Sequence, residues 1–255
     1  MLAIRSAMVE MQGGDTMKHI VQFSGGKDST CMLLMMLEKG MQVDEIIFCD
    51  TGMEFPQMYE HIEQVRKYIS RYGKEVTTLK AERSYEYMMF EHIKTKGKRQ
   101  GQKGYGWGTM LARWCTAYLK TQPAKRHLKG QEYIDYVGIA YDEPKRHEGI
   151  ADNIRHPLFD WHITEAQALS FCYEHGFTWG GLYQEFKRVS CWCCPFKSLD
   201  ELRVLYHKYP ALWEKLKDMD NRSWNQYRAD YSVAEIEERF KREDWKQGIK
   251  ISLWG

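Results

Sequence analysis

The sequence has no apolar run long enough to cross a bilayer, and residues 1–16 lack the unbroken apolar core of a secretory signal peptide. It also lacks a large net charge: 37 Lys and Arg nearly balance 35 Asp and Glu, so the global charge does not indicate a nucleic-acid-binding protein. No internal repeat is present, which argues against a solenoid. These absences favour a cytoplasmic protein with no membrane partner. We expect residues 1–17 to be a disordered extension.

What remains is the composition of an ordinary globular protein with a core of its own. Hydrophobic residues make up 43% of the 255 residues and charged residues 28%. The seven cysteines, in a chain without a recognisable secretory signal, argue against a disulfide framework and for metal binding or thiol chemistry.

In the first half of the chain, apolar strands alternate with amphipathic helices, which predicts a Rossmann-like α/β fold with a doubly wound parallel sheet. From Thr164 onward the pattern predicts helices without strands. We therefore expect a nucleotide-binding α/β domain over residues 18–163 and a helical, cysteine-bearing carboxyl-terminal part over residues 164–255. The expected strands are 19–23, 44–49, 76–79 and 134–140, and the expected helices include 31–39, 57–72, 85–93, 112–128, 199–208, 211–219 and 233–242. The expected packing anchors of the second part are Trp213, Trp224, Tyr227 and Trp245.

Residues 24–30 form the strongest motif, Ser24-Gly25-Gly26-Lys27-Asp28-Ser29-Thr30, between a short strand and a helix. Glycines let the backbone approach an anion, hydroxyls and a mobile lysine add donors, and the helix directs its free N–H groups to the same place. It is not a Walker A loop, because Asp rather than Ser or Thr follows Lys27. A plain strand–helix turn that needs glycine is the alternative. We favour a phosphate loop of the Ser-Gly-Gly-x-Asp-Ser type found in PP-loop ATP pyrophosphatases.

The cysteines form one local cluster, Cys191-Trp192-Cys193-Cys194-Pro195, with Cys115 as a distant fourth thiol. Four thiolates from two segments suit a [4Fe–4S] cluster, which we place first. Adjacent Cys193 and Cys194 make a tetrahedral zinc site harder, and either of them could be a non-ligand. Zinc is the second alternative and buried structural thiols are the third. The cysteines expected in the core are Cys31, Cys49 and Cys172.

Three motifs together resemble the phosphoadenylylsulfate (PAPS) reductase branch of the PP-loop superfamily, also described as adenine nucleotide alpha hydrolase-like. They are the phosphate loop, the segment Asp50-Thr51-Gly52-Met53-Glu54-Phe55-Pro56, and Arg113-Trp114-Cys115-Thr116 with Lys120. The resemblance runs from about residue 19 to 203. It implies that Asp50, Thr51 and Gly52 touch the ribose or adenine of the nucleotide.

The resemblance also implies a basic substrate-binding stretch over residues 142–146, because guanidinium and ammonium groups match phosphate or sulfate oxygens. A solvated loop is the alternative for this stretch. The expected substrate contacts are Arg113, Lys120, Lys145 and Arg146, and the expected catalytic residues are Lys27, Asp28 and Arg146. Mg²⁺ held partly by Asp28 or Asp50 is expected beside the ATP.

The sequence departs from the reductases at one point: no Glu-Cys-Gly-Leu-His segment is present, and no cysteine follows Cys194. We therefore expect an enzyme that adenylates a substrate, releases pyrophosphate and couples this to sulfur transfer. The acceptor could be sulfate, a tRNA base or the DNA backbone. The alternatives are a PAPS or adenylylsulfate reductase, and a nucleotide-sensing or nucleic-acid-associated module with a structural metal.

The partners differ between these alternatives. Sulfur transfer needs a sulfur donor and sulfonucleotide reduction needs a reductase protein such as thioredoxin, while the oligomeric state stays open. Residues 94–103, with five basic residues in a Gly/Gln-rich stretch, are expected to be a mobile solvated loop, or else a lid or a nucleic-acid contact.

Overall fold

A computed structural model of the chain describes residues 17–149 and 151–246. The extension expected over residues 1–17 therefore lies outside the described residues, apart from Met17. Within the described ranges, no helix combines the length and apolarity that a bilayer span needs.

Five strands form one sheet in the order β3-β2-β1-β4-β5, and every neighbouring pair is parallel. The predicted Rossmann-like sheet is thus confirmed, with the phosphate loop following the central strand. The strands are β1 (Lys18–Gln22), β2 (Glu45–Asp50), β3 (Val76–Lys80), β4 (Tyr133–Val137) and β5 (Ile154–Arg155). The two-residue β5 was not predicted, because so short a strand carries no periodicity in its sequence.

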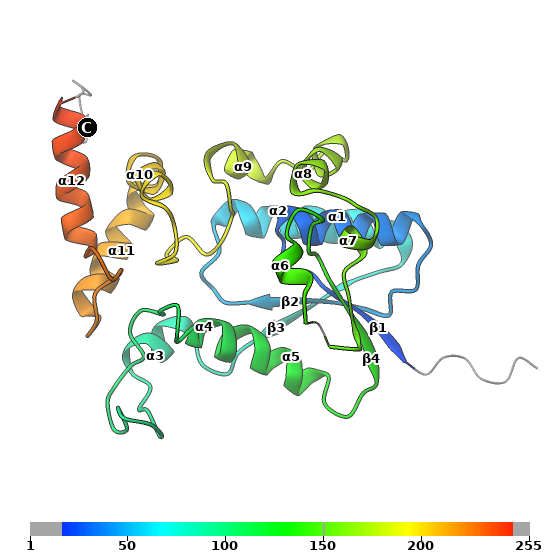
Figure 1. The fold of residues 1–255 in the computed structure, drawn as a ribbon, viewed down its shortest axis with the longest axis horizontal. Helices are drawn as coiled ribbons and strands as arrows, with labels where there is room; N and C mark the ends of the chain where they lie inside the picture. The colour runs from blue at the N-terminus through cyan, green and yellow to red at the C-terminus, as the bar shows by residue number, and fades with distance from the viewer. Residues whose placement is uncertain (1–16, 150, 247–255) are drawn as a thin grey trace, which may run out of the picture.

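Helices cover both faces of the sheet (Figure 1). On one face lie α1 (Lys27–Glu38), α2 (Pro56–Ile69) and, packed on α1, α8 (Glu165–Glu174). On the other lie α4 (Trp114–Thr116), the π-helical segment η2 (Ala117–Thr121) and α5 (Gln122–His127). The π-helical segment interrupts the single helix expected over 112–128 just before Pro123, which has no N–H to continue an α-helical ladder.

The other elements connect the layers or form the helical end of the molecule (Figure 1). They are η1 (Ser70–Tyr72), α3 (Tyr85–Phe90), α6 (Pro144–His147), α7 (Pro157–Asp160), η3 (Trp179–Gly181), α9 (Leu182–Glu185), α10 (Leu199–Lys208), α11 (Pro210–Arg222) and α12 (Val233–Lys246). The start of α8 carries a capping box, in which Thr164 and Gln167 are reciprocal partners.

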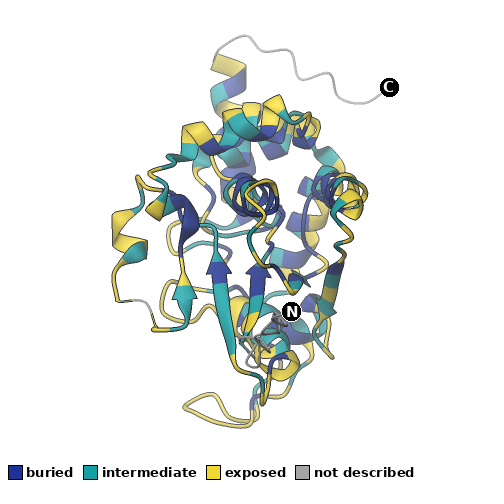
Figure 2. Cartoon of the chain, turned by 90° about the vertical axis from the view of Figure 1, so that its right-hand side faces the viewer, coloured by how far each residue is buried: buried dark blue, intermediate teal, exposed yellow. Residues whose placement is uncertain are grey.

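One buried cluster runs from the sheet into the helical end, so the core does not stop at residue 163 (Figure 2). Trp213 and Tyr227 are buried in it as expected. Two expected anchors are wrong: Trp245 is 82% exposed, and Trp224 is 41% exposed and lies between two basic side chains of the 94–103 segment. Trp245 lies on α12 and Trp224 lies in the connection between α11 and α12, and an aromatic side chain does not by itself reveal whether its position is buried.

His61 on α2 is a buried histidine whose pKa predicts a pH-dependent stability. Its ring stacks on Trp179 with 4.2 Å between ring centroids, and Nε2 lies 3.0 Å from Thr30 Oγ1. Burial lowers its pKa from 6.5 to about 3. The unfolded chain therefore binds a proton below pH 6.5 that the folded chain does not, so stability falls as pH falls through that range.

We expect the free energy of unfolding to decrease by about 2 kcal/mol between pH 7 and pH 5 through His61 alone. Urea unfolding of the wild type and of His61→Gln at both pH values measures this. The variant should start less stable but lose less on acidification. Equal losses in the two proteins would contradict a neutral buried His61.

Candidate nucleotide and thiol site

A cavity of about 500 Å³ lies at the carboxyl edge of the sheet and brings the separate motifs together. Its walls come from the phosphate loop, the loop after β2, the start of α4, the loop after β4 and the cysteine segment. Of the residues expected at the site, those that line it are Ser24, Gly26, Lys27, Asp28, Ser29, Thr51, Arg113, Cys115, Lys120, Arg146, Cys191, Cys193 and Cys194. Those that do not are Gly25, Thr30, Asp50, Gly52 and Lys145.

The phosphate loop is held in shape by its own hydroxyls. The Ser24 N–H donates to Ser29 Oγ at 3.1 Å, and Ser29 Oγ donates to the Gly26 carbonyl at 3.0 Å. Gly25 has a φ of +79°, and a Cβ there would lie 2.7 Å from Met58 Sδ, so only glycine fits. Thr30 does not face the cavity. It is buried in the core, where it contacts His61.

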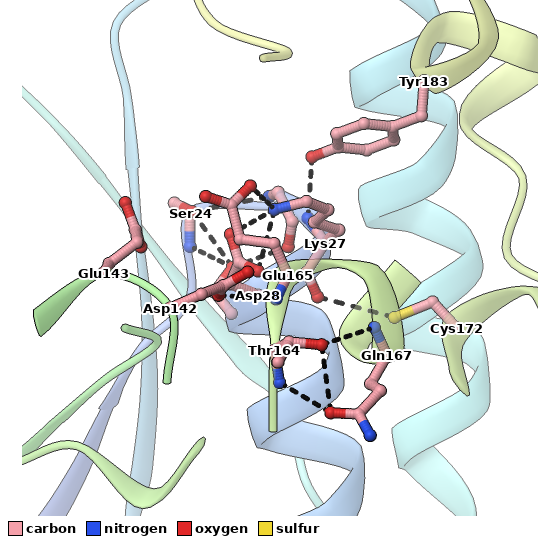
Figure 3. Close-up of polar contacts among 12 residues, drawn as sticks. Ser24, Lys27, Asp28, Asp142, Glu143, Thr164, Glu165, Gln167, Cys172 and Tyr183 are labelled. Carbon is pink, nitrogen blue, oxygen red and sulfur yellow. Dashed lines mark hydrogen bonds and ion pairs between the residues drawn. The ribbon is translucent and has the colours of Figure 1, made fainter. Parts of the chain in front are cut away.

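Lys27 is held between two carboxylates instead of being mobile (Figure 3). Its Nζ donates to both oxygens of Asp28 at 2.9 Å and to Glu165 Oε2 at 2.7 Å. Burial alone would lower the pKa of Lys27, but Asp28 and Glu165 raise it above its usual value. Burial likewise raises the pKa of Asp28, against the opposing effect of Lys27. A bound polyphosphate could take the place of these carboxylates as the partner of the ammonium group.

Two of the surrounding residues could not be found from their local sequence. Tyr183, on α9, accepts a hydrogen bond from the Lys27 N–H at 2.8 Å, so its hydroxyl occupies a donor that a phosphate could use (Figure 3). Glu165 is placed by Asp142, whose Oδ1 accepts from the Glu165 N–H at 2.9 Å. Both reach the phosphate loop from more than 130 residues away, and their sequence neighbourhoods indicate only helix starts.

The loop after β2 is organised around Asp50. Its Oδ1 accepts hydrogen bonds from the Gly52 N–H and the Tyr59 hydroxyl, both at 2.8 Å, and Oδ2 lies 3.3 Å from Lys80 Nζ. This leaves Thr51 as the residue of the expected Asp50–Gly52 set that lines the cavity. Asp50 thus shapes the loop while Asp28 presents a carboxylate to the cavity.

Glu54 connects this loop to the cysteine segment. Its buried Oε1 accepts from Thr51 Oγ1 at 3.4 Å and from the Cys191 thiol at 3.5 Å, and lies 3.6 Å from Lys120 Nζ. The Trp192 N–H adds a backbone bond to the Met53 carbonyl at 3.1 Å. The loop after β2 and the cysteine segment are therefore in direct contact.

The four expected ligand thiols surround the cavity, and burial raises the pKa of Cys115, Cys191 and Cys193. The thiols are suitable donors for a metal centre, but their positions are not those of ligands to one metal. Over residues 17–149 and 151–246, no three His, Cys, Asp or Glu side chains are grouped closely enough to hold a metal ion. Cys31 and Cys172 are buried as expected, whereas Cys49 is only half buried and donates to the Lys120 carbonyl at 3.5 Å.

The basic residues of the site differ in their positions. Arg113, Lys120 and Arg146 line the cavity, whereas Lys145 does not. Arg146 forms an ion pair with Glu143 at 2.7 Å, which holds it at the cavity wall. Further basic residues that line the cavity, and that no motif marks, are Lys187, Arg188 and Lys197.

Gly138, just after β4, permits the close approach of the phosphate loop. A Cβ at this position would lie 2.8 Å from Asp28 C and from Ser29 N, both backbone atoms. We expect Gly138→Ala to destabilise the fold by about 1–3 kcal/mol, because backbone atoms cannot move aside as a side chain can. Gly108→Ala is the control, since its nearest contact would be 3.6 Å away. Equal unfolding midpoints for the two variants in urea would contradict this packing.

Comparison with known proteins finds relatives of this chain. Two uncharacterized proteins of Methanocaldococcus jannaschii are 26% and 29% identical to the chain, over 92% and 77% of it. An uncharacterized nin region protein of Escherichia phage lambda is 30% identical over 51% of the chain. The matches cover 45%, 46% and 50% of these relatives, so the chain spans about half the length of the curated relatives it matches.

The family comparison confirms the resemblance drawn from the motifs. A sequence model described as the phosphoadenosine phosphosulfate reductase domain matches residues 18–197, which include the phosphate loop, the loop after β2 and all four cavity cysteines. The chain therefore belongs to the phosphoadenosine phosphosulfate reductase domain family, in the PAPS reductase-like branch of the PP-loop superfamily.

Proposed function

We propose that this protein binds ATP at the phosphate loop and adenylates a substrate, with release of pyrophosphate coupled to sulfur transfer. One observation carries the proposal: a single cavity is lined both by the phosphate loop and by four thiols from two distant segments. A nucleotide bound at the loop would therefore share the cavity with these four thiols.

In the proposed reaction, an acceptor oxygen attacks the α-phosphorus of ATP. The bond between the α-phosphorus and the oxygen bridging to the β-phosphate breaks, and pyrophosphate leaves with the bonding electrons. Lys27 and the loop N–H groups stabilise the negative charge that develops on the leaving phosphates. For this, Lys27 must exchange its contacts with Asp28 and Glu165 for phosphate oxygens, and Tyr183 must release the Lys27 N–H.

The residues supply suitable donors for two inorganic groups, although the described side chains are not grouped closely enough to hold a metal ion as they stand. A Mg²⁺ ion would be held by Asp28, which lines the cavity, rather than by Asp50, which is engaged within its own loop. A [4Fe–4S] cluster, or zinc as the alternative, would be held by Cys115, Cys191 and Cys194, with Cys193 as the fourth thiol. Such a centre supplies a metal at which a sulfur atom can be held. Within this chain, the Cys191 thiol donates a hydrogen bond to Glu54 and would have to lose that proton to bind a metal.

Nucleotide titration tests the proposal and separates it from its rivals. We expect anaerobically purified protein to bind one ATP per chain in calorimetry, and to give no sulfite from PAPS with thioredoxin. Sulfite production would favour the reductase alternative. ATP binding without turnover on any acceptor would favour a nucleotide-sensing module, and absence of ATP binding would contradict the proposal.

A further inference from the structure

The net charge of the chain is close to zero, but one segment contains basic residues without acidic ones. Residues 92–131 contain ten Lys and Arg and no Asp or Glu, in a protein whose totals are 37 and 35. The ten are Lys94, Lys96, Lys98, Arg99, Lys103, Arg113, Lys120, Lys125, Arg126 and Lys129. A positive charge concentrated in this way is the electrostatic footprint of a polyanion partner.

The fold keeps these charges on one layer of the molecule. Within this segment, α4, η2 and α5 lie on the face of the sheet opposite α1 and α2. The 94–103 turn extends from α3 on the same side, toward the helical end of the molecule (Figure 1). Eight of the ten side chains are exposed, the exceptions being Lys94 and Lys120. Among these eight, within the described part of the chain, only Lys103 and Arg126 form ion pairs, with Glu91 and Glu82.

The 94–103 turn, expected from its composition to be a mobile loop, makes several defined contacts. Ile93 and Lys103 form an antiparallel bridge that closes it. The Trp224 ring lies between the Lys94 ammonium group at 4.6 Å and the Arg99 guanidinium group at 4.0 Å, and its Nε1 donates to the Gly104 carbonyl at 3.2 Å. The charges are therefore presented from an ordered hairpin.

The same layer continues into the proposed active site. Gly108, Arg113 and Cys115 follow the hairpin directly and line the cavity that holds the phosphate loop. A second cavity, of about 480 Å³, opens on this layer and is lined by Lys80, Arg83, His92, Tyr118, Arg126 and His127 among others. Basic groups with aromatic and imidazole rings between them suit phosphates and bases together.

We propose that this basic layer binds a nucleic acid through its phosphodiester backbone and leads the strand to the cavity mouth at Arg113. The inference rests on the proposed function only where it identifies nucleic acid as the class of acceptor. Binding of the strand itself requires no ATP. Single-stranded DNA, single-stranded RNA and duplex DNA share the backbone chemistry, and the test includes all three.

The test is fluorescence anisotropy with labelled 20-nucleotide probes of each kind, titrated with the full chain without ATP at several salt concentrations. The variant Lys96→Gln/Lys98→Gln/Lys125→Gln removes three exposed lysines of the basic layer. The matched control, Lys18→Gln/Lys39→Gln/Lys67→Gln, removes the same charge from β1 and the α1–α2 side. All six lysines are exposed, so both variants should fold, and thermal unfolding checks this.

We expect the wild type and the control to bind at least one probe with similar affinity, and the basic-layer variant to bind it at least 10-fold more weakly. For a single strand, the slope of log affinity against log salt should also fall by about 2, since three phosphate contacts are lost. No binding of any probe at low salt, or an equal loss in both variants, would overturn the proposal. The ATP affinity of both variants is measured as well. If it is unchanged, a failure of the nucleic-acid proposal does not extend to the proposed nucleotide site.

Discussion

Replacing Lys27 by glutamine should lower kcat/KM for ATP-dependent pyrophosphate release by about 100-fold or more. Lys27 is the buried cation of the phosphate loop, held by Asp28 and Glu165 at the cavity wall. Glutamine keeps a hydrogen-bond donor of similar length but removes the charge that stabilises the leaving phosphates. The measurement is a coupled pyrophosphate assay over a range of ATP concentrations.

Lys39→Gln is the matched control, because it removes a lysine just beyond the opposite end of the same helix, α1. It should change kcat/KM by less than about threefold, since a distant exposed charge is largely screened. Circular dichroism checks that both variants are folded. Equal kcat/KM values for Lys27→Gln and Lys39→Gln would contradict a role of the phosphate loop in the mechanism.

The second large effect is expected at the thiols: Cys115→Ser should lose most of the bound metal. Serine keeps the shape of the side chain but is a poor ligand for iron or zinc in such a site. The same loss is expected for Cys191→Ser and Cys194→Ser. Elemental analysis for iron, zinc and sulfide, with an absorption spectrum after anaerobic purification, gives metal per chain and identifies the centre.

Cys49→Ser is the best control for this series. Like Cys115 it is a half-buried thiol, but it does not line the cavity that holds the phosphate loop. Its metal content should equal that of the wild type. Full metal occupancy in Cys115→Ser would mean that the three cysteines of residues 191–194 act without the distant segment.

Most of the sheet could be predicted because its strands are continuous apolar runs separated by helix and turn signals. The parallel order then brings the loops after β1, β2 and β4 to one edge, and the structure places Ser24, Thr51 and Arg146 from these loops in one cavity. This convergence follows from topology alone, so local motifs were enough to anticipate it.

The contacts within the site could not be predicted in the same way. Tyr183 and Glu165 reach Lys27 across 156 and 138 residues, and nothing local marks them. The exposure of Trp245 depends on which face of α12 packs, and that of Trp224 on the path of the chain between α11 and α12; composition gives neither. The Gly, Gln and Lys content of residues 94–103 is typical of solvated loops and does not reveal their contact with Trp224, which lies more than 120 residues away.

The most direct test of the central claim is the position of the bond that is cleaved in ATP. The protein is incubated with Mg²⁺ and ATP labelled at the γ-phosphate, together with sulfate, tRNA or DNA as acceptor, and the products are separated. We predict that the label appears in pyrophosphate, accompanied by AMP or an adenylated acceptor, and that Lys27→Gln abolishes it. Label appearing in orthophosphate together with ADP would contradict the account.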